Sequence, residues 1–222
     1  MRTKVIDLLK RGARLAVSED RLDGFKELGM DPDLETEEAI SRASVVIDCT
    51  PSGIGHKNKE KYYHKFMKSC KGFLAQGSES GFGKKYARRI NDATLNSDDQ
   101  FIQIVSCNTH NLCCITHTLA LDGDHDNLEE GRFVCIRRAN DISQSGSFIP
   151  SPQVGSHGSP KYGTHHAEDA AELFHTMDID LNLFSSAVKV NSQYMHVLWF
   201  TLRVKEPTTL TALLAKLYAN PY

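Results

Sequence analysis

The chain has 222 residues, 40% of them hydrophobic and 24% charged, with a formal net charge of -2. This length allows one large domain or two small ones with a real core, and the near balance of charge gives no reason to expect a nucleic-acid or membrane partner. No run approaches the roughly 18 apolar residues that a membrane span needs, and the polar N-terminus does not read as a secretory signal, so we expect a cytoplasmic protein.

The first part of the chain alternates strand and helix patterns. Strands are expected at residues 14–20, 45–49 and 72–77, and helices at 21–30, 36–43 and 56–70. Gly29 closes the first of these helices, and a proline and two glycines separate the second strand from the basic helix that follows it. This alternation predicts a parallel sheet covered by helices.

The pattern changes after residue 106. Residues 131–139 and 186–206 indicate longer strands of a mixed or antiparallel sheet, and a helix begins at about residue 210. Residues 143–163 are rich in Gly, Ser and Pro and are expected to form mostly loop. We therefore place a domain boundary near residue 106.

Six cysteines are spread along the chain without the spacing of a small secreted disulfide scaffold. The adjacent pair Cys113 and Cys114 is awkward for two ordinary bridges, so we expect reduced thiols. Cys107 is distinctive because it follows a strand pattern, "FIQIV", and precedes a helix pattern that begins at about Asn108. Free amides and the positive end of the helix dipole favour a thiolate there, which indicates a nucleophile; a small buried residue is the alternative.

A thiolate nucleophile needs a base, and histidine is the usual one near neutral pH. His165 and His166 form a pair beyond the loop rich in Gly, Ser and Pro, where simple solvation is the alternative. His196 lies in the apolar string "YMHVLWF", expected to be a strand, where a core or interface role is the alternative.

Two other patterns leave different functions open. Cys107, His110, Cys114 and His117 recur at helical spacings and could share one face as a zinc site, although the paired C-x-x-C spacing of a structural zinc site is absent. The basic helix at 56–70 mixes lysines with aromatic residues, as a nucleic-acid-binding segment can. No RNA- or DNA-binding module accompanies it, so we interpret it as a solvated amphipathic helix.

Six segments in this order carry a family resemblance: "VIDCTPSGIGHKNKE", "AQGSES", "IVSCNTHNL", "CIRRANDIS", "THHAED" and "YMHVLWFTLRVKEP". Together they resemble the archaeal-type (type II) glyceraldehyde-3-phosphate dehydrogenases, from about Arg14 to Pro207. The "SCNT" motif is specific when it follows "TPSGIG" and "KNK" and precedes a His-His pair.

The resemblance implies a phosphorylating dehydrogenase of glycolysis and gluconeogenesis, which oxidises glyceraldehyde 3-phosphate with NAD or NADP and inorganic phosphate to 1,3-bisphosphoglycerate. It implies Cys107 as the nucleophile that forms a thioester, His196 as the general base, and a homotetramer. The substrate contacts that it implies are Ser106, Cys107, Asn108, His165 and His166, and the cofactor contacts are Gly77 and Arg138.

The implied fold is α/β: an incomplete Rossmann-like NAD(P)-binding domain with a parallel sheet in residues 1–106, and an α+β catalytic domain with a mainly antiparallel sheet in residues 107–222. No glycine loop for the dinucleotide pyrophosphate is recognisable, because neither "GIGHKN" nor "GFGKKY" continues to a third glycine. The chain is thus expected to match the middle of such an enzyme, without the family's C-terminal part, and the strand at 45–49 is expected to lack a neighbour.

The chain also departs from the family next to the implied contacts. Ser78 stands where the family generally has a second glycine, and Ala167 and Glu168 replace a Gly-Pro pair after the histidines. An alternative to the dehydrogenase is therefore a catalytically inactive fragment that acts as an oligomerisation or ligand-binding module.

Overall fold

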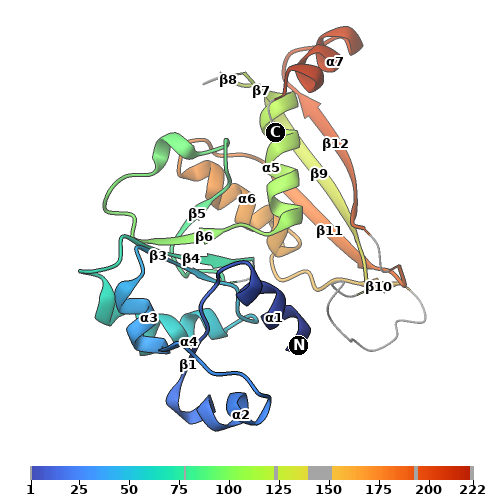
Figure 1. Ribbon diagram of the computed structural model, residues 1–222. Coiled ribbons are helices and arrows are strands. Elements are labelled where there is room, and N and C mark those ends of the chain that lie inside the picture. Colours follow the sequence, from blue (N-terminus) through green and yellow to red (C-terminus); the bar gives the residue numbers. More distant parts are fainter. Residues whose placement is uncertain (1, 78, 123–124, 140–151, 193–194, 221–222) are drawn as a thin grey trace.

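The computed structural model describes residues 2–77, 79–122, 125–139, 152–192 and 195–220. Within these residues the strands form two four-stranded sheets and two two-stranded pairs. The parallel sheet lies in the first half of the chain and the mixed sheet in the second half, with α5 (Cys107–Ala120) and α6 (His165–His175) between them (Figure 1). The expected α/β architecture is confirmed.

The first sheet is fully parallel, as the alternation of strands and helices predicted. In spatial order its strands are β3 (Val45–Asp48), β4 (Gly72–Gln76), β6 (Phe101–Ile104) and β5 (Lys84–Tyr86). α3 (Thr36–Arg42) and α4 (Ile54–Lys61) accompany it, and a small aromatic core forms where the ring of Tyr63 stacks on Phe73 at 4.9 Å between centroids.

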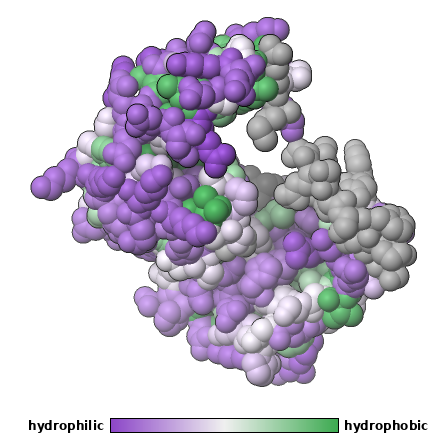
Figure 2. Space-filling view, turned by 90° about the horizontal axis from the view of Figure 1, so that it is seen from below, coloured by the Kyte–Doolittle hydropathy of each residue, from purple (hydrophilic) through white to green (hydrophobic). Residues whose placement is uncertain are grey.

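The N-terminal elements do not extend this sheet. β1 (Ala16–Val17) pairs in parallel with β2 (Leu34–Glu35). β3 pairs with β4 on one side and, within the described residues, has no strand on the other, as expected, so it lies at the sheet edge. The outward side chains of β3 are open to solvent: Val45 is 48% and Ile47 62% exposed. The remaining N-terminal elements are α1 (Arg2–Lys10), a 3-10 helix (Glu19–Arg21) and α2 (Leu22–Glu27). The face seen from below is mostly hydrophilic where it is coloured, with small separate hydrophobic patches (Figure 2).

The basic helix was expected at 56–70, but α4 begins at Ile54 and ends at Lys61. It begins early because the carboxylate of Glu79 accepts the backbone N–H groups of Gly53 and His56. It ends early because the chain turns into a 3-10 helix, Tyr63–Phe66, in which the Tyr63 hydroxyl donates to Asp48 at 2.7 Å. Tertiary contacts therefore override the local helical pattern at both ends.

The second sheet is mixed, and two of its three strand pairs are antiparallel. In spatial order its strands are β10 (Gln153–Val154), β11 (Leu183–Lys189), β9 (Leu128–Arg137) and β12 (Val197–Val204). Residues 186–206, expected to be largely strand, divide between β11 and β12. His196, expected inside a strand, lies directly before β12, because pairing with β9 begins only at Val197.

The main hydrophobic core lies between the mixed sheet and α5 and α6. Phe133 of β9 and Phe174 of α6 are fully buried in it, next to Leu112 of α5. The His165–His166 pair, expected beyond the loop rich in Gly, Ser and Pro, opens α6, and the alternative of simple solvation is wrong for His166, which is buried. The elements not yet described are a 3-10 helix (Asp92–Thr94), the strand pair β7 (Leu121–Asp122) and β8 (His125–Asp126), and α7 (Leu210–Ala219).

Residues 143–151 of the expected loop lie outside the described residues, and β10 occupies part of the remainder. Among the described residues, no helix has the length and apolar character needed to cross a membrane.

Candidate active site

A cavity of about 780 Å³ lies at the junction of the two sheets. Its walls come from the carboxyl ends of β3, β4 and β6, the N-termini of α5 and α6, and the end of β9. The structure brings all the predicted site residues together in its lining: Gly77, Ser106, Cys107, Asn108, Arg138, His165, His166 and His196. These residues come from segments spread between positions 77 and 196, so only the tertiary structure makes them neighbours.

Cys107 is the first residue of α5, as its place between a strand and a helix predicted. Ser106 is the N-cap, and its hydroxyl oxygen accepts the Thr109 N–H at 3.3 Å, which fixes the entry into the helix. The thiol of Cys107 is exposed, so the alternative of a small buried residue is wrong. A thiol at this end of a helix meets the positive end of the helix dipole.

Three of the other five cysteines differ from Cys107 because they are buried, whereas Cys49 is exposed and also lines the cavity. All six are free, and Cys70, Cys113 and Cys135 are buried. Burial raises the pKa of the Cys135 thiol to about 11, and burial likewise raises that of Cys113 well above its ordinary value. Buried thiols with raised pKa values react poorly as nucleophiles, which leaves the reactive role to exposed ones.

His196 is held by the backbone directly after β9. Its Nδ1 accepts the N–H of Arg138 at 3.2 Å. A neutral imidazole that accepts at Nδ1 carries its proton on Nε2, so the ring in this position is a hydrogen-bond donor at Nε2.

The His pair lies in the first turn of α6, with ring centroids 4.0 Å apart. His166 is 1% exposed, and its Nδ1 is 3.0 Å from the Thr164 hydroxyl oxygen. Burial, followed by the charges of His165, Arg137 and His196, lowers the pKa of His166 to about 3. His166 is therefore uncharged near neutral pH.

Arg137 is a cavity residue that the sequence reasoning missed. Its buried Nε has no hydrogen-bond partner within the described part of the chain, and its charge acts on both histidines of the pair. Alternation along β9 could have identified it, because Phe133 and Cys135, at the two preceding positions of the same face, are both buried. A guanidinium beside a helix N-terminus favours an anion.

The loop after β4 places Gly77 against the cavity. Gly77 has φ of +63°, a conformation that favours glycine, and a Cβ there would meet no atom within 4 Å. Its carbonyl accepts from the Gln103 side chain at 3.2 Å, and the buried Glu79 two positions later ties the loop to α4. Ser78, the departure noted between them, lies outside the described residues.

Both G-x-G strings have structural explanations. The N-terminus of α4 lies within "GIG". The Glu79 carboxylate accepts its Gly53 and His56 N–H groups, so these amides are closed to a pyrophosphate. Gly83 of "GFG" packs so closely that a Cβ would lie 2.0 Å from the Phe101 carbonyl oxygen. The described residues thus include no glycine loop for a dinucleotide pyrophosphate.

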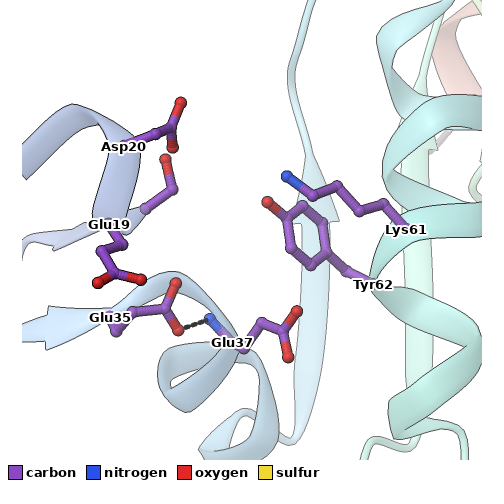
Figure 3. A pocket seen from close by; sticks show the side chains of 7 residues that line it. Glu19, Asp20, Glu35, Glu37, Lys61 and Tyr62 are labelled. Carbon is purple, nitrogen blue, oxygen red and sulfur yellow. Dashed lines mark hydrogen bonds between the residues drawn. The ribbon is translucent and has the colours of Figure 1, made fainter.

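A second hollow, of about 470 Å³, lies at the carboxyl ends of β1 and β2 and holds none of the predicted site residues. Figure 3 shows Lys61 and Tyr62 of the α4 region facing carboxylates on the other wall. One of these has a structural role, because the Glu35 carboxylate accepts the Glu37 N–H at 2.6 Å at the start of α3.

The zinc alternative is not supported: no group of three or more His, Cys, Asp or Glu side chains in the described ranges could hold a metal ion. The basic helix uses part of its charge internally. Lys59 donates to the Phe82 carbonyl at 2.6 Å and lies 4.2 Å from the Phe101 ring centroid, and Lys65 pairs with Glu37 at 2.8 Å.

Fold and site together define an α/β protein in which an exposed thiol at a helix N-terminus, three histidines and two arginines line one cavity at the edge of a parallel sheet. No family model matches the chain. It is similar to curated proteins named glyceraldehyde-3-phosphate dehydrogenase from three archaea: it is 27% identical over 203 residues to that of Pyrobaculum islandicum, 30% over 210 residues to that of Methanothermus fervidus and 30% over 212 residues to that of Methanopyrus kandleri.

These alignments cover 87%, 91% and 89% of the chain but 54%, 56% and 55% of the three relatives. The chain therefore spans about half the length of the curated relatives it matches. The resemblance carried by the six segments is confirmed: the chain is a relative of the archaeal glyceraldehyde-3-phosphate dehydrogenases.

Proposed function

We propose that the chain is a phosphorylating glyceraldehyde-3-phosphate dehydrogenase, which oxidises glyceraldehyde 3-phosphate with NAD or NADP and inorganic phosphate to 1,3-bisphosphoglycerate in the glycolysis and gluconeogenesis of the cytoplasm. One observation carries the proposal: the residues that match the family's motifs, read from six separate segments, line one cavity. The similarity to enzymes of that name supports it.

In this proposal the Cys107 thiolate attacks the aldehyde carbon and forms a C–S bond. The Cys107 N–H and the Asn108 side chain, both at the start of α5, stabilise the oxygen that gains negative charge. Gly77 and Arg138 would hold the nicotinamide, which would supply the oxidant for the hydride that leaves the same carbon. The acyl group then remains on Cys107 as a thioester. Inorganic phosphate attacks the thioester carbon, the C–S bond breaks, and 1,3-bisphosphoglycerate and the Cys107 thiolate are released.

His196 is proposed to move the proton of the substrate oxygen. With Nδ1 accepting the Arg138 N–H, its Nε2–H can donate to that oxygen. To act instead as a base at Nε2, the ring must release this contact and carry its proton on Nδ1. The Arg138 backbone therefore biases which of the two proton positions the ring adopts.

Arg137, His165 and His166 are proposed to hold phosphate at the N-terminus of α6, where the helix amides and the guanidinium favour an anion. Residues 1–106 would form the cofactor-binding domain, with the nicotinamide near Gly77 and Arg138, and residues 107–222 the catalytic domain.

A homo-oligomer, in the family a tetramer, is proposed to use the open face of the mixed sheet. Val197 and Trp199 alternate on β12 away from the core and are 55% and 58% exposed. Apolar side chains at such alternating positions favour a partner surface over solvent.

The test is turnover by the 222-residue chain, followed as absorbance of the reduced cofactor with NAD or NADP, in a wild type and two serine variants. Cys107→Ser is expected to abolish turnover, while Cys114→Ser, on the same helix but outside the cavity lining, is the matched control and is expected to keep it. Without phosphate, the acylated Cys107 should accumulate and add the mass of the acyl group to the intact protein. Turnover that survives Cys107→Ser would refute the assignment.

The second candidate function is an inactive ligand-binding or oligomerisation module. It is favoured by the capped α4 N-terminus and by the absence, among the described residues, of a loop for the pyrophosphate. Calorimetric titration separates the two functions. A folded chain that binds inorganic phosphate but neither NAD nor NADP, and shows no turnover, would establish the module.

A further inference from the structure

The N-terminus of α6 is capped in an unusual way. Thr164 is the N-cap residue, with φ of -93° and ψ of 161°, yet its side chain accepts no helix N–H. A threonine at this position ordinarily accepts the N–H two or three residues later. Here Ser185 of β11 does so instead: its hydroxyl oxygen accepts the Ala167 N–H at 3.0 Å. The Thr164 hydroxyl is thereby released for another contact.

That contact is with the imidazole of His166. The Thr164 hydroxyl oxygen lies 3.0 Å from His166 Nδ1 and 2.6 Å from the Ser185 hydroxyl oxygen. Thr164, His166 and Ser185 are 2%, 1% and 0% exposed, so bulk water does not compete for these groups. A chain of three buried polar side chains thus runs from β11 to the cavity that His166 lines.

Each hydroxyl has one hydrogen, which leaves two ways to arrange the chain. If Ser185 donates to Thr164, Thr164 donates to His166 Nδ1, and the imidazole proton must be on Nε2. If Thr164 donates to Ser185, the Ser185 hydrogen turns to the Thr164 carbonyl, 3.3 Å away, and His166 carries its proton on Nδ1. An oxyanion beside Nε2 favours the first arrangement, in which Nε2–H donates to it. In the second arrangement Nε2 has no hydrogen, and its lone pair would face the negative charge.

We propose that Ser185 and Thr164 form a hydroxyl relay that sets the tautomer of His166, so that an uncharged His166 donates its Nε2–H to a phosphate group in the cavity. This rests on the proposed function, of which it defines the phosphate-binding step. Thr164 and Ser185 are positioning residues, since they act only through His166. Charge for the same anion comes from Arg137, whose guanidinium lines the cavity.

The relay explains how a buried, uncharged histidine can donate a hydrogen bond to an anion. Burial holds the pKa of His166 near 3, so protonation at neutral pH is not available to it. A neutral ring is a donor only in one tautomer, and the Thr164 hydroxyl selects that tautomer by filling Nδ1. The charge of His166 should therefore stay the same between about pH 6 and 8, so any change of phosphate binding in this range comes from other groups or from the phosphate's own second ionisation.

The test reads the tautomer directly, from ring ¹⁵N shifts of labelled histidine in the full chain, with inorganic phosphate as the probe and His166→Gln to assign the signals. The variants are Thr164→Val, which keeps the shape of the side chain but removes the hydroxyl, and Thr164→Ser, which restores the hydroxyl. We expect the Nε2–H tautomer in the wild type and in Thr164→Ser, its loss in Thr164→Val, and about tenfold weaker phosphate binding in Thr164→Val alone.

Repeating the titration with glycerol 3-phosphate separates the two sources of phosphate. If Thr164→Val weakens the binding of glycerol 3-phosphate only, His166 contacts the substrate's phosphate. If it weakens the binding of both probes, the two share one site. An unchanged tautomer and unchanged affinity in Thr164→Val would overturn the relay, as would a wild type that binds neither probe. Because neither readout needs turnover, a chain with an intact relay and no dehydrogenase activity would refute the proposed function alone.

Discussion

The two four-stranded sheets differ in how completely they are packed. The mixed sheet and its two helices enclose a continuous core, with Phe133 and Phe174 fully buried in it. The parallel sheet has only a small aromatic core around Phe73 and Phe82, and its edge strand β3 exposes Val45 and Ile47. The second half of the chain therefore buries the larger core, while the parallel sheet of the first half contributes strand ends to the cavity.

A buried ion pair joins the two halves beside the cavity. Lys85 of β5 pairs with Asp169 of α6, and both side chains are nearly inaccessible. Asn91 adds a hydrogen bond to the Thr176 hydroxyl at 3.0 Å. Since α6 also carries His165 and His166, this pair fixes the helix that holds two site residues.

The largest expected effect is in the main core. Phe133→Ala should lower the free energy of unfolding by about 4 kcal/mol, because it removes buried surface and leaves a cavity. Urea unfolding should be followed by the fluorescence of Trp199, the single tryptophan, which lies on β12 next to β9. Phe82→Ala in the small core is the comparison and should leave the Trp199 transition nearly unchanged. Equal losses in both variants would show that the two cores unfold as one.

Breaking the link between the halves should cost slightly less. Lys85→Met leaves the Asp169 carboxylate buried without its cation, with an expected loss of about 3 kcal/mol in the free energy of unfolding. The double variant Lys85→Met with Asp169→Leu should recover most of it, because no buried charge remains. A double-mutant cycle measures this coupling, and a coupling near zero would mean that the pair does not hold the halves together.

Acidification should weaken the half that holds His166. Its pKa is near 3 in the folded chain and about 6.5 when unfolded, so between these values the unfolded chain binds more protons and stability falls with falling pH. From pH 7 to pH 5 the expected loss is about 2 kcal/mol. His166→Gln should lack this component, so the two chains' urea midpoints are compared at both pH values. If the urea midpoints of both chains fall by the same amount between pH 7 and pH 5, His166 is not the group responsible for the loss of stability.

The smallest effect is expected at the open edge. Ile47→Lys should change the free energy of unfolding by less than about 0.5 kcal/mol, because this side chain is already exposed, and should reduce association measured by light scattering. Val46→Lys is the control: Val46 packs against the small core, so a lysine there should destabilise the chain clearly. A large loss at position 47 would indicate that another surface covers this edge.

Local sequence patterns were enough to predict most of the strands and helices, although not their bounds, and the junction at Cys107. Alternating strand and helix patterns predicted the parallel sheet, and the string "FIQIVSCNT" predicted a cysteine at a helix N-terminus, which the structure has. These features depend on neighbouring residues, whose propensities and capping groups act over a few positions. The family resemblance added the site residues, which turned out to share one cavity.

Only the tertiary structure decided how distant groups meet. Arg137 in the cavity, the Lys85–Asp169 pair 84 positions apart, the Glu79 cap on α4 and the Ser185–Thr164–His166 chain follow no local pattern. Each depends on which elements pack together, and burial then sets the charge state and hydrogen-bond partner of the side chain. For this reason the sequence could indicate a thiol nucleophile, while the protonation of the histidine beside it required the fold.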